Sequence, residues 1–205
     1  MLSDLPEDER LAYLPDFMHS LLKASALNNG AFQEANDWSC AAVWMPPGKK
    51  IDNPFTVIQA GLVGIAWKIG IRGCKKMFIE FEAQTNAAKK KYLRDAKGKP
   101  LKQFYYLWFI ATDRPARGQG LAARVVGKWQ EKAANEGQAI WLEATTAKSR
   151  DVYTRCGFRE VGEPISMGKG THAATGAYEE GGPGVVVSKF MGKRITPSTR
   201  LSRGV

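Results

Sequence analysis

The residues best suited to chemistry lie in one glycine-rich segment, Arg117-Gly118-Gln119-Gly120-Leu121-Ala122, between an apolar run and a helical pattern. At a helix start the first backbone N–H groups lack partners within the helix, and the helix dipole adds positive potential. Glycines let an anionic ligand approach such a backbone closely. The segment therefore predicts a cradle for a diphosphate. In isolation, the hexapeptide is better explained as a plain turn from a strand to a helix.

The segments on either side of this cradle alternate between strands and helices. Residues 104–112 form a continuous apolar and aromatic run, which predicts a strand covered on both faces at the centre of a sheet. A helical pattern follows over residues 121–135, and residues 139–144 predict the next strand. Thr145 or Thr146 can cap a short helix that ends at Gly157. Two strand-helix units in succession predict parallel neighbouring strands in an α/β sheet.

The first half of the chain predicts further helices. A helix is expected over residues 7–28, with an apolar stripe made by Leu11, Leu14, Met18, Leu21, Leu22 and Ala26. A strand is expected over 40–44, and helices over 55–69 and 76–94. The apolar stretch 55–71 is interrupted by polar residues and falls short of the length needed to span a bilayer, so we expect it in the core or in a pocket wall.

The end of the chain predicts a hairpin and a tail. Strands are expected over residues 159–165 and 185–190, on either side of a glycine-rich loop at 168–184. Residues 1–196 are expected to form one domain, and residues 197–205 a basic, disordered tail.

Three of these segments resemble, in the right order, the GNAT superfamily of N-acetyltransferases. Arg117, Gly120 and Ala122 match the family signature Arg/Gln-x-x-Gly-x-Gly/Ala, and residues 105–112 resemble the family's fourth strand. Tyr153, four residues before Gly157-Phe158, resembles the Tyr-x-x-x-Gly-Phe helix end of the family. The resemblance covers residues 104–162. It implies the GNAT fold, a central mixed sheet flanked by helices, and acetyl-CoA as the acetyl donor.

Other segments refine the resemblance or depart from it. Ala42-Val43-Trp44-Met45-Pro46-Pro47-Gly48 resembles a segment of a GNAT subgroup that includes the puromycin N-acetyltransferases and many uncharacterised fungal and bacterial members. Arg114-Pro115 places proline one position later than is usual in the family, and Thr146 stands where asparagine is common. The chain opens with what resembles the family's second helix and lacks the usual first strand and helix.

The resemblance implies which residues contact acetyl-CoA. Backbone N–H groups near the end of the central strand would hold the acetyl carbonyl and the pantetheine, provided that the strand splays or bulges there. The residues expected at the cofactor are Ile110, Ala111, Thr112, Arg117, Gly118, Gln119, Gly120, Leu121, Ala122, Thr146 and Ser149. Ser149 has a second interpretation, in which its hydroxyl only solvates the helix.

Acetyl transfer to an amine needs a neutral amine and a proton for the departing thiolate. Tyr153 is the candidate acid, because a phenol titrates near pH ~10 and carries its proton at neutral pH. The alternative is a core tyrosine packed beside Phe158. Glu143 is the candidate base, and a surface carboxylate is the alternative; Glu80 and Glu82 are weaker candidates.

Composition limits the partners of this chain. The 205 residues carry a net charge of +10, but the basic residues are dispersed in short groups, which favours a solvated surface and cofactor phosphates over nucleic acid. The three cysteines lie far apart and the chain has only two histidines, so no metal is expected. The acidic N-terminal residues 1–14 lack the pattern of a signal peptide, which predicts a cytoplasmic or nuclear protein.

The leading hypothesis is therefore an enzyme that transfers an acetyl group from acetyl-CoA to the primary amine of a small molecule, by direct attack in a ternary complex. A protein N-terminus or a lysine is the alternative acceptor. A catalytically idle acyl-CoA-binding module is compatible with the shortened start. The hypothesis that the chain binds nucleic acid rests on its net charge alone. No membrane partner is expected, and the sequence does not predict an oligomeric state.

Overall fold

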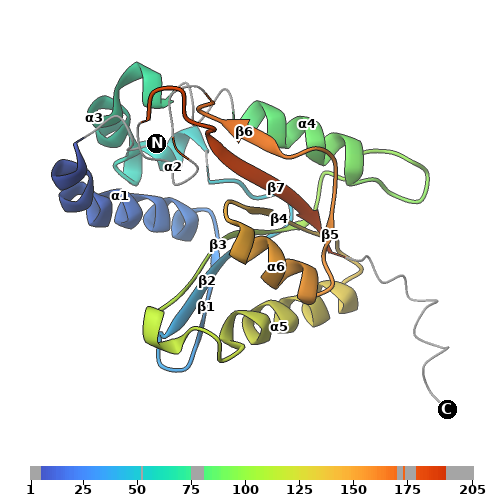
Figure 1. The fold of residues 1–205 in the computed structure, drawn as a ribbon. Helices are drawn as coiled ribbons and strands as arrows, with labels where there is room; N and C mark the ends of the chain where they lie inside the picture. Colours follow the sequence, from blue (N-terminus) through green and yellow to red (C-terminus); the bar gives the residue numbers. More distant parts are fainter. Residues whose placement is uncertain (1–5, 52, 75–80, 170–172, 174–178, 193–205) are drawn as a thin grey trace, which may run out of the picture.

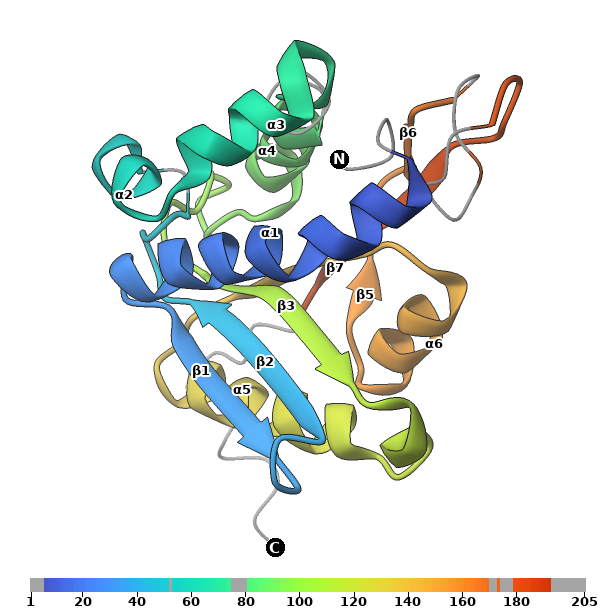
Figure 2. The same ribbon diagram turned by 90° about the vertical axis from the view of Figure 1, so that its left-hand side faces the viewer.

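The computed structural model of the chain describes residues 6–51, 53–74, 81–169, 173 and 179–192. They form a mixed sheet of seven strands in the order β1-β2-β3-β4-β7-β5, with β6 paired to β7 (Figures 1 and 2). The strands are β1 (Ala31–Ala35), β2 (Cys40–Met45), β3 (Tyr105–Thr112), β4 (Ile140–Ala144), β5 (Arg159–Glu160), β6 (Ile165–Met167) and β7 (Val185–Met191). The helices are α1 (Glu7–Leu27), α2 (Pro54–Gln59), α3 (Leu62–Cys74), α4 (Glu82–Tyr92), α5 (Leu121–Asn135), α6 (Ala147–Arg155) and a 3-10 turn, η2 (Arg114–Ala116).

The sheet separates two apolar clusters. On one face, α5 and α6 pack against the strands through residues such as Val125, Leu142 and Phe190. On the other face, α4 packs over β4 and β7 through Ala88 and Trp141. Figure 1 shows α4 on one side of these strands and α5 and α6 on the other. Because Trp141 and Leu142 are consecutive, β4 contributes alternate side chains to both clusters.

The predicted α/β core of the second half is confirmed. Strands β3 and β4 are parallel neighbours, and every other pair of strands in the sheet is antiparallel. Helix α5 begins at Leu121 and ends at Asn135, as expected from the glycines that flank it. Thr146 is the N-cap of α6, and its hydroxyl accepts a hydrogen bond from the Ser149 backbone N–H. The sequence rules for helix ends were thus sufficient for these elements.

Helix α1 is confirmed, but only part of the predicted apolar stripe packs against the protein: Met18 and Leu21 pack against the cluster shared with α2 and α3. Leu11 and Leu14 are exposed, whereas Phe17 and Ala24 are buried against α2 and α3. Apolar residues lie on more than one side of this helix, so periodicity alone could not decide which side packs against the protein.

The apolar stretch 55–71 is divided between two helices, α2 and α3, instead of forming one. Its placement in the core is wrong for its largest side chains, since Phe55 is 81% and Trp67 is 91% exposed. Leu62 and Ile65 are buried. The helix predicted over 76–94 is α4, which begins at Glu82; residues 75–80 lie outside the described residues.

Strand β1 was missed by the sequence analysis. It pairs with β2 and forms an edge of the sheet, and α1 is the first element of the described residues. Its hairpin turn uses Asn36, Asp37 and Trp38, all with positive φ, instead of the glycine that usually marks such a turn. The strand predicted over 159–165 is two short strands, β5 and β6, and β6 forms the expected hairpin with β7. Most of the predicted loop between them and the tail from residue 193 lie outside the described residues.

Candidate active site

The site is built around an opening between β3 and β4. The two strands pair only through Tyr105 with Ile140, Tyr106 with Trp141 and Leu107 with Leu142. Strand β3 continues to Thr112, so its backbone after Leu107 has no pairing with β4. The two parallel strands therefore diverge from this point, which we call the apex.

A β-bulge lies at the same place. On its other side β3 pairs with β2, and the register shifts so that Val43 faces Phe109 while Trp44 faces Leu107. Trp108 is thus the extra residue of β3, and such bulges re-aim the strand that contains them. The bulge and the divergence together supply the geometry that the sequence analysis required for the backbone of Ile110, Ala111 and Thr112. Ala111 is exposed.

The glycine-rich segment lies between the end of β3 and the start of α5. Gly118 and Gly120 have φ values of 84° and 73°, and a Cβ added at either position would meet no atom within 4 Å. Gly120 is the N-cap of α5, and no side chain caps this helix end. The first amides of α5 therefore have no side-chain cap, as a diphosphate site would require. The geometry of this segment fits an anionic ligand.

Two side chains of the segment fold back onto its own backbone. Arg117 donates from Nε to the Thr112 carbonyl oxygen at 3.0 Å, and Gln119 donates from Nε2 to the Pro115 carbonyl oxygen at 3.4 Å. These bonds fix the loop against the end of β3. In this arrangement the side chains of Arg117 and Gln119 stabilise the loop, and only their backbone groups are left to face a ligand.

Thr146 and Ser149 cap the second helix that begins at the opening. The Thr146 hydroxyl accepts from the Ser149 backbone N–H at 3.1 Å, and the Ser149 hydroxyl donates to the Thr146 carbonyl oxygen at 2.9 Å. Thr146 is exposed and Ser149 is half-buried, and both follow shortly after β4. Their contact with a cofactor stays a prediction.

Glu143 is the first residue of β4 beyond the apex. Its side chain is only 5% exposed, so it is not a surface carboxylate. Trp141 donates from Nε1 to Glu143 Oε1 at 2.6 Å, and Lys89 Nζ lies 3.6 Å from the same oxygen. The carboxylate is therefore held in place on the α4 side of the sheet by an indole and an ammonium.

Tyr106 completes this buried group of polar side chains. Burial, followed by the charge and a hydrogen bond of Glu143, raises the pKa of Tyr106 well above 10.0. Lys89 Nζ lies 4.3 Å from the centre of the Tyr106 ring, within the range of a cation–π contact. The sequence analysis missed Tyr106, Trp141 and Lys89 as members of the site. The only signal for Tyr106 and Trp141 was the alternation of side chains between the two faces of β3 and β4. Lys89 belongs to one of the short basic groups that were expected on a solvated surface.

Tyr153 lies on the other side of the sheet. It is 5% exposed and packs against the rings of Phe158 and Phe190, with centroids 6.2 and 5.9 Å away. Burial raises its pKa to about 12, with smaller contributions from Cys156 and from the negative charge of Glu143. The phenol thus keeps its proton at neutral pH, and the charge of Glu143 contributes to its raised pKa. This geometry is compatible with both interpretations of Tyr153, the core residue and the acid.

The weaker acidic candidates are less well placed. Glu82 begins α4, accepts a hydrogen bond from the Asn86 side chain and lies 3.9 Å from Lys50 Nζ. Glu80 lies outside the described residues.

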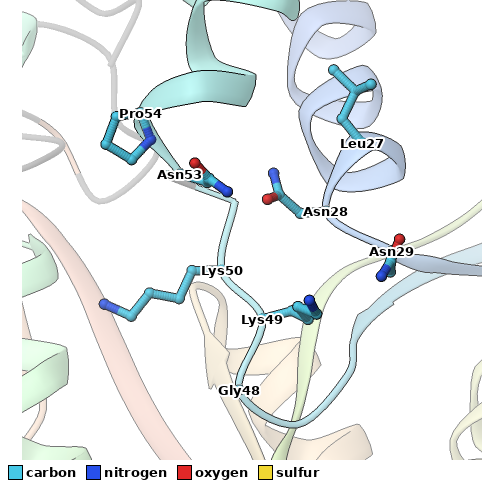
Figure 3. A pocket seen from close by; sticks show the side chains of 8 residues that line it. All are labelled: Leu27, Asn28, Asn29, Gly48, Lys49, Lys50, Asn53 and Pro54. Atoms are coloured by element: carbon cyan, nitrogen blue, oxygen red, sulfur yellow. The ribbon is translucent and has the colours of Figure 1, made fainter.

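A separate cavity of about 520 Å³ lies between the end of α1 and the segment that joins β2 to α2 (Figure 3). Its walls include Asn28, Asn53 and two lysines, Lys49 and Lys50. None of the residues predicted for catalysis or cofactor binding lines it. Within the described part of the chain, no helix is long and apolar enough to cross a membrane, and no group of three or more potential metal-ligating side chains is found.

Comparisons with known proteins agree with this geometry. The profile of the acetyltransferase (GNAT) family matches residues 94–158. An uncharacterised N-acetyltransferase of Schizosaccharomyces pombe is 25% identical over 129 residues, which are 63% of this chain and 51% of that protein. The chain thus spans about half the length of this relative.

Two solved structures share the fold. A histone acetyltransferase HPA2 and related acetyltransferase from Corynebacterium glutamicum is 21% identical, with a TM-score of 0.51 over 95% of this chain and 81% of that chain. Arylalkylamine N-acetyltransferase 2 from Aedes aegypti is 19% identical, with a TM-score of 0.52 over 90% of this chain and 95% of that chain. The mixed sheet with its diverging parallel strands is thus a GNAT fold. The family profile matches residues 94–158, the segment that contains the parallel strands and the glycine-rich loop, and so agrees with this fold.

Proposed function

We propose that this chain transfers the acetyl group of acetyl-CoA to a primary amine by direct attack in a ternary complex. The observation that carries the proposal is the apex, where β3 and β4 stop pairing beside a bulge at Trp108 and a buried carboxylate, Glu143. A plain strand-to-helix turn would need neither the divergence nor the buried charge. Residues 1–196 would form the domain that performs this reaction.

The donor would lie along the part of β3 that pairs with β2 but no longer pairs with β4. The amides at the start of α5, after Gly120, would bind the diphosphate. The backbone groups of Ile110, Ala111 and Thr112 on the side of β3 away from β2 would bind the pantetheine and polarise the acetyl carbonyl. Acetyl-CoA supplies the activated thioester. The protein holds the carbonyl next to the apex with backbone donors, so no side chain is required for this step.

The acid and the base would act from opposite faces of the sheet. Glu143 belongs to the α4 face, and Tyr153 belongs to the cluster formed by α5 and α6. Glu143 would accept a proton from the acceptor ammonium, and Tyr153 would donate its proton toward the departing sulfur. Because the pKa of Tyr153 is raised to about 12, the phenol carries its proton at neutral pH and has it available when the thiolate departs.

The environment of Glu143 favours a cationic amine as the acceptor. A buried carboxylate and the face of the Tyr106 ring both attract an ammonium, as their contact with Lys89 illustrates. The subgroup resemblance of residues 42–48 points to a small acceptor molecule. A protein N-terminus or lysine is the alternative acceptor, since an exposed amine on a peptide offers the same ammonium.

A panel of amines tests the proposal. The purified chain is mixed with acetyl-CoA and each amine, free thiol is measured, and the acetylated amine is identified by mass spectrometry. We expect thiol release that depends on both the amine and the protein, in equal amounts with the product. Donor binding without thiol release for any amine, including peptides, would instead indicate an idle acyl-CoA-binding module.

A further inference from the structure

Lys89 differs from the two lysines that follow it on α4. Lys90 and Lys91 are exposed, whereas the Lys89 side chain is only 16% exposed and points to the sheet. Its Nζ atom lies 3.6 Å from Glu143 Oε1 and 4.3 Å from the centre of the Tyr106 ring. The protein therefore places a primary amine of its own against the candidate general base.

In this arrangement an amine lies within reach of a group that can accept its proton, as an acetyl acceptor requires. An ammonium must lose a proton before its nitrogen can attack a carbonyl, and the group that accepts the proton must lie within reach of it. Lys89 satisfies this requirement through Glu143, which also receives the Trp141 indole and is thereby held in one orientation. The ammonium of Lys89 thus stands where the proposed function would place the ammonium of an external amine.

The position along the sheet also fits. Glu143 is the first residue past the last β3–β4 pair, so it lies across the opening from Trp108, and Ile110 lies two residues, about 7 Å, further along β3. The lysine stem has four rotatable methylene groups, which allow its nitrogen to move by several ångströms without any change of the backbone. The amine can therefore leave Glu143 and enter the opening.

We propose that Lys89 is itself an acetyl acceptor, so that the protein acetylates this lysine from the donor that it binds. The inference rests on the proposed function, since it needs acetyl-CoA at the apex. Glu143 takes one proton from the Lys89 ammonium. The Nζ lone pair then forms a bond to the acetyl carbon, the carbon–sulfur bond breaks, and the departing thiolate receives a proton from Tyr153 or from water. The nitrogen, which still carries two protons after the bond forms, gives one of them to the group that protonated the thiolate, and Glu143 returns its proton to solvent. The products are Nε-acetyl-Lys89 and free CoA, and no further reactant is needed.

The modification has a physical limit. Acetylation removes the positive charge of Lys89, so the ion pair with Glu143 and the cation–π contact with Tyr106 are both lost. Because each chain has one lysine in this place, the reaction ends after one acetyl group per chain. It is also intramolecular, so its rate constant is independent of protein concentration.

The test incubates the purified chain with acetyl-CoA in the absence of any amine and maps acetylated lysines by peptide mass spectrometry. Lys90 and Lys91 serve as internal controls for spontaneous chemical acetylation, since they lie on the same helix and are exposed. We expect Lys89 to be labelled at least about tenfold faster than either. Lys89→Arg should remove this label, whereas the matched control Lys90→Arg should retain it. Glu143→Gln should slow labelling of Lys89 about tenfold or more and leave the background at Lys91 unchanged.

Donor binding, measured by calorimetry, and thiol release with external amines are recorded on the same samples. A chain that binds the donor and acetylates an external amine but leaves Lys89 unmodified would overturn the inference and preserve the proposed function. Equal labelling of Lys89, Lys90 and Lys91 would also overturn it, because the reaction would then be chemical. A chain that does not bind the donor would overturn both.

Discussion

Gly120 and Gly137 provide a matched pair of substitutions for the diphosphate cradle. They flank the two ends of α5, both have a positive φ, 73° and 65°, and a Cβ added at either would meet no atom within 4 Å. Gly120→Trp and Gly137→Trp should therefore have the same structural cost. Only Gly120 lies at the helix start, where the first amides have no side-chain cap.

The magnitudes follow from the backbone and from the ligand. A residue other than glycine in the left-handed region costs about 1–2 kcal/mol, so each variant should lose about that much free energy of unfolding. A bulky side chain at Gly120 would in addition keep the diphosphate away from the amides. Loss of two charge-assisted hydrogen bonds, worth about 1.5 kcal/mol or more each, weakens binding by about 3 kcal/mol, or more than about 100-fold in Kd.

Urea unfolding gives the stability of both variants, and calorimetry gives their Kd for CoA. We expect equal losses of stability and a loss of CoA affinity in Gly120→Trp alone. Unchanged affinity in a folded Gly120→Trp protein, or the same loss of affinity in Gly137→Trp, would refute the placement of the diphosphate at this helix start.

The other predictions concern the two ends of α6. Tyr153→Phe keeps the ring contacts and removes the proton, so turnover should fall about 100-fold or more while the Kd for CoA changes little; a variant as fast as the parent on a verified acceptor would remove Tyr153 as the acid. The raised pKa of Tyr153, about 12, means that its stability contribution is complete below pH ~10 and is lost as the pH rises toward 12. Unfolding at alkaline pH should thus show a loss of about 3 kcal/mol over this range that is absent in Tyr153→Phe, and identical profiles would contradict the burial of the phenol. Thr146→Ala removes the helix cap and should cost about 1 kcal/mol in urea unfolding; no change would mean that the capping bond is not formed in solution.

The second half of the chain was predictable because local rules agree with the packing there. The glycines around α5 and the threonine before α6 mark helix ends directly, and the apolar run of β3 has the length of a buried strand. The positions of the cradle and of Glu143 beside the opening followed from these elements. Each depends on a few neighbouring residues, which a sequence displays.

The first half was less predictable because tertiary contacts decide it. Trp67 is exposed although its segment is the most apolar of the chain, and α1 buries Phe17 most fully while the predicted Leu11 and Leu14 are exposed. Strand β1, Ala-Phe-Gln-Glu-Ala, shows no regular alternation of apolar and polar residues and ends in a turn without glycine, so no local pattern marks it. Lys89 joins the site only because α4 crosses above β4, a contact between residues more than 50 positions apart in the chain. Such contacts cannot be read from spacing alone.

The most direct test of the account is a structure of the chain with acetyl-CoA bound. We expect the diphosphate on the amides that follow Gly120, the pantetheine along Ile110 to Thr112, and the thioester at the apex, with Glu143 and Tyr153 on opposite faces of the sheet. A donor bound elsewhere, for example in the cavity beside Lys49 and Lys50, or a thioester that neither Glu143 nor Tyr153 approaches, would contradict it.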